Sequence, residues 1–203
     1  MKTIKFGFFA VVTALVAFFS SSMAYNVGDV VADFKLKNID GKMVSLANYK
    51  ADAKGYIIVF TCNHCPYSKA YDDRLLALDK KYAALGYSLI AINPTDATAN
   101  DEDSYENMQA KAKEKGFTFP YLVDENQGVA KAFSATKTPY TVVVKKEGDK
   151  FLVQYIGAID DNPQDATGVS KRYVEEAVGN LLAGKPVMTT TTRSVGCSIK
   201  FKN

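Results

Sequence analysis

The sequence carries little excess charge of either sign. Its formal net charge is +3 over 203 residues, and the charged residues are interspersed rather than clustered. Such a balance gives no electrostatic basis for binding nucleic acid. The sequence also lacks tryptophan and has a single histidine and three cysteines. A site that needs two histidines is therefore excluded, and we look for chemistry around Cys62, Cys65 and Cys197.

A long apolar run stands at the beginning of the chain. Two lysines precede an apolar core over residues 6–19, and Ser-Met-Ala at 22–24 forms a small-x-small cleavage site. The core is shorter than the ~20 residues that a membrane-spanning helix needs. We therefore predict a signal peptide over residues 1–24, cleaved before Tyr25, which exports the protein to the periplasm or the medium. A retained membrane anchor is the alternative.

Cleavage would leave a nearly neutral protein. Residues 1–24 carry two lysines and no acidic residue, so their removal lowers the net charge from +3 to +1. No cysteine stands at the cleavage site, which argues against a lipid anchor. After cleavage we expect no stable insertion into a membrane.

A Cys-x-x-Cys motif stands between a predicted strand and a predicted helix. A run of β-forming residues covers 56–60, and apolar residues then recur every three or four positions from Tyr67 to Leu85. We therefore expect Cys62 at a helix N-terminus, where free N–H groups and the helix dipole stabilise a thiolate. Cys65 follows one turn later and can close a disulfide with Cys62.

The rest of the sequence alternates between strand and helix patterns. Asp40-Gly41 predicts the turn of a hairpin, and Asp103 with Glu106 predicts a capping box for a helix that Gly116 closes. The expected elements, in order, are a hairpin over 33–46, strands over 56–60, 87–93, 121–123, 140–145 and 151–156, and helices over 66–85, 103–116, 127–133 and 169–182. This order implies a mixed sheet with helices on both faces.

The length suits one domain of ordinary size. We expect the signal peptide over 1–24, one domain over 25–186, and a C-terminal tail over 187–203 that carries Cys197. Three interpretations of Cys197 stay open. It is a free thiol without a role, or it pairs with another chain, or it folds back as an additional resolving thiol near Cys62.

These features resemble the thioredoxin-like superfamily and, within it, the redoxin branch of AhpC/TSA-like and TlpA-like proteins. The order strand, Cys-x-x-Cys, helix carries the resemblance, together with the hairpin over 33–46 and with Thr138-Pro139 before a strand. The resemblance implies an α/β, thioredoxin-like fold: a central mixed sheet flanked by helices, with an extra N-terminal hairpin. It also implies a cis peptide bond before Pro139, which leaves the backbone of Thr138 free to pair with an extended substrate.

The resemblance implies an exported thiol–disulfide oxidoreductase without cofactor or metal. Cys62 would attack a disulfide of a protein, and Cys65 would resolve the mixed disulfide. His64, as an imidazolium beside the helix start, would lower the pKa of Cys62; a C-x-H-C centre resembles the DsbA-type oxidases in this respect. The expected partners are protein thiols and disulfides and an unidentified redox partner. The residues Gly-Cys-Ser-Ile-Lys-Phe around Cys197 resemble the end of a subset of redoxin proteins.

The sequence departs from thioredoxins at two places. Tyr56 stands about where thioredoxins have a buried aspartate that accepts a proton, and Thr61 replaces the tryptophan before the first cysteine. Lys69 or Glu125 could deprotonate Cys65 instead.

Two other functions remain as alternatives. A peroxiredoxin-like antioxidant peroxidase would need an arginine near the thiolate, but the sequence has only Arg74, Arg172 and Arg193, none of them just before the late strand. A zinc or copper protein could use the Cys-x-x-Cys pair with Cys197 as a third sulfur. The copper-chaperone relatives of this fold, however, use Cys-x-x-x-Cys with a distant histidine.

Overall fold

The computed structural model describes residues 24–202 of the chain. The predicted signal peptide therefore lies, apart from Ala24, outside the described residues. Within the described part, no helix has the length and the apolar character needed to cross a membrane.

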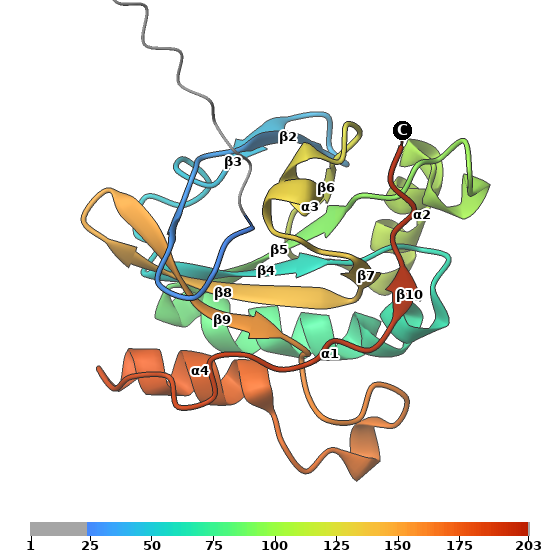
Figure 1. The fold of residues 1–203 in the computed structure, drawn as a ribbon. Helices are drawn as coiled ribbons and strands as arrows, with labels where there is room; N and C mark the ends of the chain where they lie inside the picture. The colour runs from blue at the N-terminus through green and yellow to red at the C-terminus, as the bar shows by residue number, and fades with distance from the viewer. Residues whose placement is uncertain (1–23, 203) are drawn as a thin grey trace, which may run out of the picture.

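The fold is built around one mixed sheet of eight strands (Figure 1). From one edge to the other, its strands are β1 (Val30–Val31), β9 (Lys150–Gly157), β8 (Tyr140–Glu147), β4 (Gly55–Phe60), β5 (Tyr87–Asn93), β6 (Tyr121–Val123), β2 (Lys35–Asn38) and β3 (Met43–Ser45). The three strands β4, β5 and β6 run parallel, and the other neighbours are antiparallel. The order confirms the predicted mixed sheet and its additional N-terminal hairpin, β2–β3.

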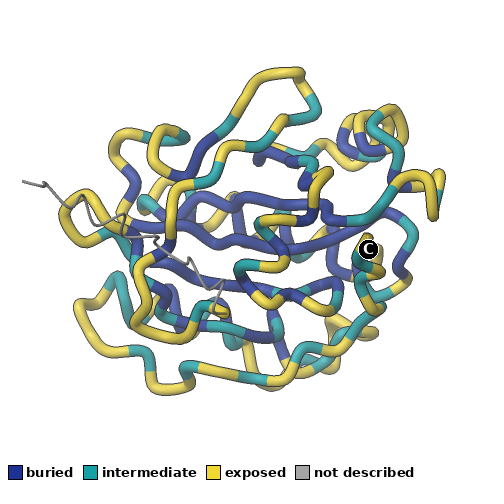
Figure 2. The backbone as a smooth tube through the Cα atoms, turned by 45° about the horizontal axis from the view of Figure 1, so that its top comes forward, coloured by how far each residue is buried: buried dark blue, intermediate teal, exposed yellow. Residues whose placement is uncertain are grey.

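Strand β4 lies at the centre of the sheet and is buried on both faces. Alternate side chains of a strand point to opposite faces, so Ile57 and Val59 join one hydrophobic cluster and Tyr56, Ile58 and Phe60 join the other. All five side chains are fully buried, as the dark central strands in Figure 2 show. The strand is thereby fixed in place, and so is the point at which it ends.

Helices cover both faces of the sheet, as predicted. Helices α1 (Pro66–Tyr82), α2 (Tyr105–Lys115) and α4 (Tyr173–Leu182) contribute to the cluster of Ile57, whereas α3 (Gly128–Ala132) contributes to the cluster of Ile58. Helix α4 starts four residues later than predicted. The N–H group of Ser170 donates a hydrogen bond to Asp161 Oδ1 at 3.0 Å and is thereby drawn away from the helix.

The C-terminal residues lie along the surface of the domain, beside β9 and then β7 (Lys137–Thr138; Figure 1). We call residues 187–202 the tail. The tail first follows the end of β9, where the N–H group of Ile156 donates to the carbonyl of Thr190 at 3.0 Å and the N–H group of Thr192 donates back to Ile156 at 3.0 Å. It then forms β10 (Cys197–Ser198), which pairs antiparallel with β7.

Candidate active site

The Cys-x-x-Cys motif occupies the turn between β4 and α1. Thr61 still belongs to the sheet, because its N–H group donates to the carbonyl of Ile92 at 2.9 Å. Helix α1 begins at Pro66, and its N-cap is Cys65. The sequence predicts Cys62 at the helix N-terminus, but the structure places Cys65 there. The chain needs the intervening residues to turn from the end of β4 into the helix.

Thr138 lies against both cysteine sulfurs. The peptide bond between Thr138 and Pro139 is cis, which confirms the prediction. The hydroxyl of Thr138 and the Sγ atom of Cys62 form a 3.0 Å hydrogen bond. The Sγ atom of Cys65 lies 3.3 Å from the carbonyl oxygen of the same threonine. Thr138, the residue before the cis peptide bond, therefore contacts both cysteine sulfurs from the side of the site opposite α1.

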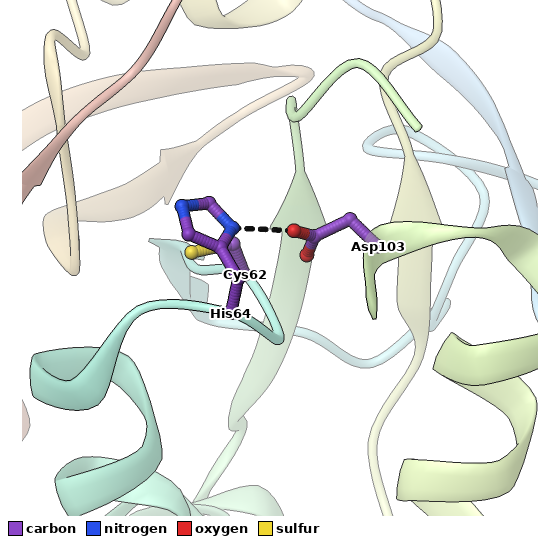
Figure 3. A group of neighbouring side chains, drawn as sticks. All are labelled: Cys62, His64 and Asp103. Carbon is purple, nitrogen blue, oxygen red and sulfur yellow. Dashed lines mark hydrogen bonds and ion pairs between the residues drawn. The ribbon is translucent and has the colours of Figure 1, made fainter. Parts of the chain in front are cut away.

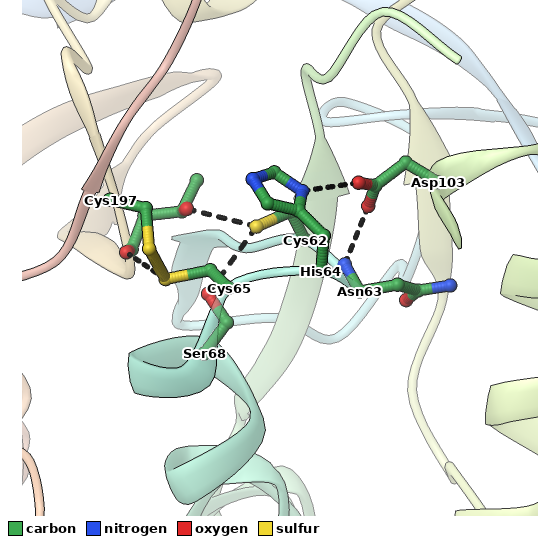
Figure 4. The surroundings of a disulfide bond; sticks show 8 residues. Cys62, Asn63, His64, Cys65, Ser68, Asp103 and Cys197 are labelled. Carbon is green, nitrogen blue, oxygen red and sulfur yellow. Dashed lines mark hydrogen bonds and ion pairs between the residues drawn. A yellow bond between two sulfur atoms is a disulfide. The ribbon is translucent and has the colours of Figure 1, made fainter. Parts of the chain in front are cut away.

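The disulfide in the structure differs from the predicted one. Cys65 is bonded to Cys197, with Cα atoms 5.9 Å apart, and Cys62 is a free thiol (Figure 4). The expected Cys62–Cys65 bond and the interpretation of Cys197 as a free thiol are both wrong for this state. The reason is the pairing of β10 with β7, which sets Cys197 directly opposite Thr138. The tail does fold back, as one interpretation expects, but its sulfur meets Cys65 rather than Cys62.

The thiol of Cys62 is fully buried in this state. Burial raises the pKa of the Cys62 thiol; the hydrogen bond from Thr138 opposes the rise, and the negative charge of Asp103 adds to it. A hydrogen bond with Ser68, at 3.7 Å, and one from the backbone of Cys65 lower the pKa by lesser amounts. The lowered pKa that the sequence predicts for Cys62 is therefore not found while Cys65 is bonded to Cys197.

His64 lies over the Cys62 sulfur and is held by Asp103 (Figure 3). Its Nδ1 atom is hydrogen-bonded to Oδ2 of Asp103, whose side chain is fully buried, while 27% of the His64 side chain is exposed. The other carboxylate oxygen accepts a 2.9 Å hydrogen bond from the side chain of Asn93 and one from the N–H group of Asn63. Asp103 thus fixes both the imidazole ring and the backbone of the motif.

Asp103 is the residue of this site that the sequence analysis missed. The capping-box pattern assigns it to the exposed start of a helix. In the structure, Asp103 closes a short 3₁₀ turn (Asp101–Asp103), and Ser104 is the N-cap of α2 instead, accepting a hydrogen bond from the N–H group of Asn107. The turn rotates Asp103 inward. A pattern of four residues contains no signal for this rotation, because the group that Asp103 binds lies 39 residues earlier.

The two residues considered for deprotonating Cys65 lie elsewhere. Lys69 makes a 2.8 Å ion pair with Glu102 at the surface. Glu125 is exposed, and its carbonyl oxygen accepts a hydrogen bond from Lys202. Among the interactions of residues 24–202, neither side chain is bonded to a cysteine sulfur, so the structure does not bring them to the site.

A different set of donors from the predicted one could hold a metal ion. Cys62, His64 and Asp103 each offer a ligand atom, and these atoms lie within 4.8 Å of one another. The metal alternative drawn from the sequence also uses Cys62, but it takes its other two sulfurs from Cys65 and Cys197. Their sulfurs are joined to each other here and offer no thiolate.

Comparison with known proteins identifies the family. The model of the AhpC/TSA family matches residues 27–152, which is more than half of the chain. The chain belongs to the AhpC/TSA family. This AhpC/TSA protein is 27% identical to the thiol-disulfide oxidoreductase ResA of Geobacillus thermodenitrificans over 134 residues, 64% of this chain and 70% of that protein.

Two solved structures cover nearly the whole AhpC/TSA protein. An uncharacterized conserved protein from Geobacillus kaustophilus is 40% identical, with a TM-score of 0.79 over 87% of this chain and 93% of that chain. A hypothetical protein from Sinorhizobium meliloti 1021 is 34% identical, with a TM-score of 0.80 over 89% and 97% of the two chains. The family and the relatives confirm the predicted redoxin family and an oxidoreductase activity. Less similar thiol:disulfide interchange proteins share the predicted thioredoxin-like fold.

Proposed function

We propose that this chain is an exported thiol–disulfide oxidoreductase that exchanges disulfides with proteins through Cys62 and Cys65. The observation that carries the proposal is the position of the two sulfurs. Both sulfurs lie at the junction of β4 and α1 and against Thr138, beside the cis peptide bond. The membership in the AhpC/TSA family and the similarity to a thiol-disulfide oxidoreductase support the same chemistry.

The exchange proceeds in two steps. The thiolate of Cys62 attacks one sulfur of a protein disulfide, forming a mixed disulfide and releasing the other sulfur as a thiolate. The thiolate of Cys65 then attacks Cys62, which breaks the mixed disulfide and leaves the Cys62–Cys65 bond while the second sulfur of the partner departs as a thiolate. Read in reverse, the oxidised pair converts two protein thiols into a disulfide.

His64 and Asp103 serve the first step. With Nδ1 bound to Asp103, the imidazole keeps Nε2 to take up a proton, and the resulting imidazolium stabilises a nearby thiolate. The buried carboxylate holds the ring in place over Cys62. We therefore assign His64 the tuning of Cys62, with Asp103 as its positioning residue. Thr138 and Pro139 serve the partner protein, whose extended backbone pairs with Thr138.

The location follows from the predicted signal peptide. The apolar core over 6–19 and the cleavage site over 22–24 suit export, and an oxidising compartment suits a functional disulfide. The test is N-terminal sequencing of the protein released from the periplasm or the medium of cells that make the full chain. A mature protein that starts at Tyr25 supports export, and a cytosolic protein that starts at Met1 contradicts it.

Turnover of a protein disulfide tests the chemistry. Insulin reduction in the presence of dithiothreitol should be accelerated by the wild-type protein and not by the Cys62→Ser or Cys65→Ser proteins. The Lys69→Ala protein is the control, since the Lys69 side chain is paired with Glu102 at the surface, and it should match the wild type. A Cys62→Ser protein as active as the wild type would contradict the mechanism.

Peroxidase activity is tested with the same proteins. The three arginines do not contact either sulfur in the described chain; Arg74, for example, is paired with Asp160 at 2.7 Å. A peroxide bound at Cys62 would therefore have Thr138 and His64 beside it in place of an arginine. Consumption of hydrogen peroxide with a thiol present, at rates that depend on Cys65, would favour the peroxidase over the exchange enzyme.

A further inference from the structure

The tail occupies the place proposed above for a partner protein. Cys197 lies opposite Thr138 in the β7–β10 pair, and the N–H group of Ile199 donates to the carbonyl of Thr136 at 2.9 Å. The chain thus places its own extended strand β10, with a cysteine in it, along the backbone edge of β7, next to Pro139 (Figure 1).

The fit of the tail depends on particular residues. A Cβ atom at Gly196 would collide with the carbonyl group of Thr138, so only glycine allows the two backbones to approach this closely. The fully buried side chain of Gln127 holds the tail further on. Its Nε2 atom donates to the carbonyl of Lys200 at 2.9 Å, and its Oε1 atom accepts from the N–H group of Lys202 at 2.7 Å.

The three sulfurs converge on one residue. The Cys62 thiol contacts the hydroxyl of Thr138, Cys65 contacts its carbonyl, and Cys197 is its partner in the strand pair. The free thiol of Cys62 stands three residues before Cys65 and accepts a hydrogen bond from the backbone of Cys65. Cys62 is therefore placed to attack the bond that holds the tail.

We propose that Cys197 is a third redox-active thiol. It exchanges with Cys62 as the disulfide partner of Cys65, and this exchange fastens or releases the tail. The proposal rests on the exchange function proposed above. The thiolate of Cys62 attacks Sγ of Cys65, the Cys62–Cys65 bond forms, and the Cys65–Cys197 bond breaks. Cys197 leaves with the electron pair and takes up the proton that Cys62 lost. One disulfide exists before and after, so the step needs no oxidant or reductant.

The two disulfides define two states of the site. With Cys65–Cys197 closed, Cys62 is buried and β10 covers the edge of Thr138. With Cys62–Cys65 closed, the tail is held only by its strand pair and its packing, and a partner protein can displace it. The partner must then present its own cysteine in an extended segment at the same edge, since the tail shows what that edge accepts.

Disulfide mapping tests the exchange on the wild-type protein. Trypsin releases residues 55–69, which contain Cys62 and Cys65, and residues 194–200, which contain Cys197. Protein equilibrated in dithiothreitol redox buffers is quenched with acid, alkylated with N-ethylmaleimide and digested. We expect both the link between the two peptides and the loop within 55–69. Detection of the loop alone, with Cys197 alkylated in every buffer, would overturn the proposal.

Two variants test whether docking of the tail governs the ratio of the two disulfides. The Gly196→Val protein should shift the ratio by about tenfold or more toward Cys62–Cys65, because the added side chain meets the Thr138 carbonyl. Gly179→Val is the matched control, since Gly179 faces open space. Gln127→Gly removes the tail's hydrogen bonds without added volume and should shift the ratio the same way. An unchanged ratio in both tail variants would overturn the proposal.

The Cys62→Ser protein and the turnover assay separate this proposal from the proposed function. In that protein the link to Cys197 should form and should not convert into a loop; loss of the link would overturn the exchange. If insulin reduction needs Cys62 and Cys65 while mapping finds no link to Cys197, the exchange with the tail fails and the function stands. If the Cys62→Ser protein turns over insulin like the wild type, the function itself fails.

Discussion

Burial and neighbouring groups set the ionisation of the Cys62 thiol, and they act in opposite directions. Burial raises the pKa of Cys62, Thr138 lowers it through a hydrogen bond, and Asp103 raises it through its charge. The balance leaves Cys62 less ionised than a free cysteine while the tail is fastened. A thiol that is not ionised is a poor nucleophile. The state with the Cys65–Cys197 disulfide therefore also lowers the reactivity of Cys62.

Two substitutions should move the pKa of Cys62 in opposite directions. Thr138→Val removes a hydrogen bond to the thiolate and should raise the pKa. Asp103→Asn removes a negative charge but keeps a side-chain oxygen that can accept the hydrogen bond from Nδ1 of His64, so it should lower the pKa. The measurement is the ¹³Cβ chemical shift of Cys62 against pH in oxidised protein labelled at cysteine, and the Cys62→Ser protein identifies the signal. A change of the Cys62 pKa in the same direction in both variants would contradict this account of the site.

Residue identities could be predicted from the sequence where the signal is local. Cys62, Cys65 and Pro139 stand in patterns of a few residues, and the family resemblance that these patterns carry implies the cis peptide bond that the structure contains. Asp103 and Cys197 could not be placed in the same way. Each acts on a residue far away in the chain, 132 positions in the case of Cys65 and Cys197, and neither the spacing nor the composition records such a contact.

At the scale of elements, two neighbouring residues at the start of α2 differ: one caps the helix, and the other contacts the candidate site. Ser104 caps the helix by accepting a hydrogen bond from Asn107, at 3.4 Å, whereas the neighbouring Asp103 turns inward to His64. The capping-box pattern predicted the helix correctly but assigned its N-cap to Asp103 instead of Ser104, because both a serine and an aspartate suit the N-cap position.

The two neighbours should therefore respond differently to alanine. Ser104→Ala should lower the free energy of unfolding by about 1 kcal/mol and leave insulin reduction at the wild-type rate. Asp103→Ala should reduce the rate by tenfold or more at pH 7, since it releases His64 and leaves the N–H group of Asn63 without its buried partner. Urea unfolding and the insulin assay measure both effects. Equal rates in the two variants would contradict the role of Asp103.

The tail is an element whose partners periodicity does not reveal. Strands β4 and β5 and helix α1 were predicted because their apolar residues repeat with the period of a strand or a helix. Residues 195–201 of the tail do alternate between apolar and other residues, as a strand does, but alternation does not say which strand they pair with. The tail is held by backbone pairing with β7 and β9, by Gln127 and by packing of Ile199 and Phe201. These partners lie far away in the chain, so the sequence of the tail does not identify them.

Gln127 should be the main support of the tail beyond β10. The residue has a φ of +56°, which glycine tolerates well, so Gln127→Gly removes the side chain with little strain in the backbone. We expect faster tryptic cleavage after Lys200 and loss of hydrogen-exchange protection at the N–H group of Lys202, with β4 and α1 unaffected. Unchanged protection at Lys202 would show that the tail is held without Gln127.

At the scale of the whole molecule, the two disulfides differ in the length of chain that they close. Cys65 and Cys197 are separated by 132 positions, whereas Cys62 and Cys65 are neighbours on one turn. A disulfide restricts the unfolded chain more when its loop is long, by about 5 kcal/mol for a loop of this length against about 2 kcal/mol for a loop of a few residues. The fastened tail therefore stabilises the entire domain.

This difference gives a measurable consequence. Oxidised Cys62→Ser protein holds only the long loop, and oxidised Cys197→Ser protein holds only the short one. Reduction should lower the free energy of unfolding of the first by about 3 kcal/mol more than that of the second, as measured by urea unfolding with and without dithiothreitol. Equal losses would show that Cys197 is not bonded across the domain in solution. If the difference is found, release of the tail also leaves the protein easier to unfold, so that the form ready for a partner protein is the less stable of the two.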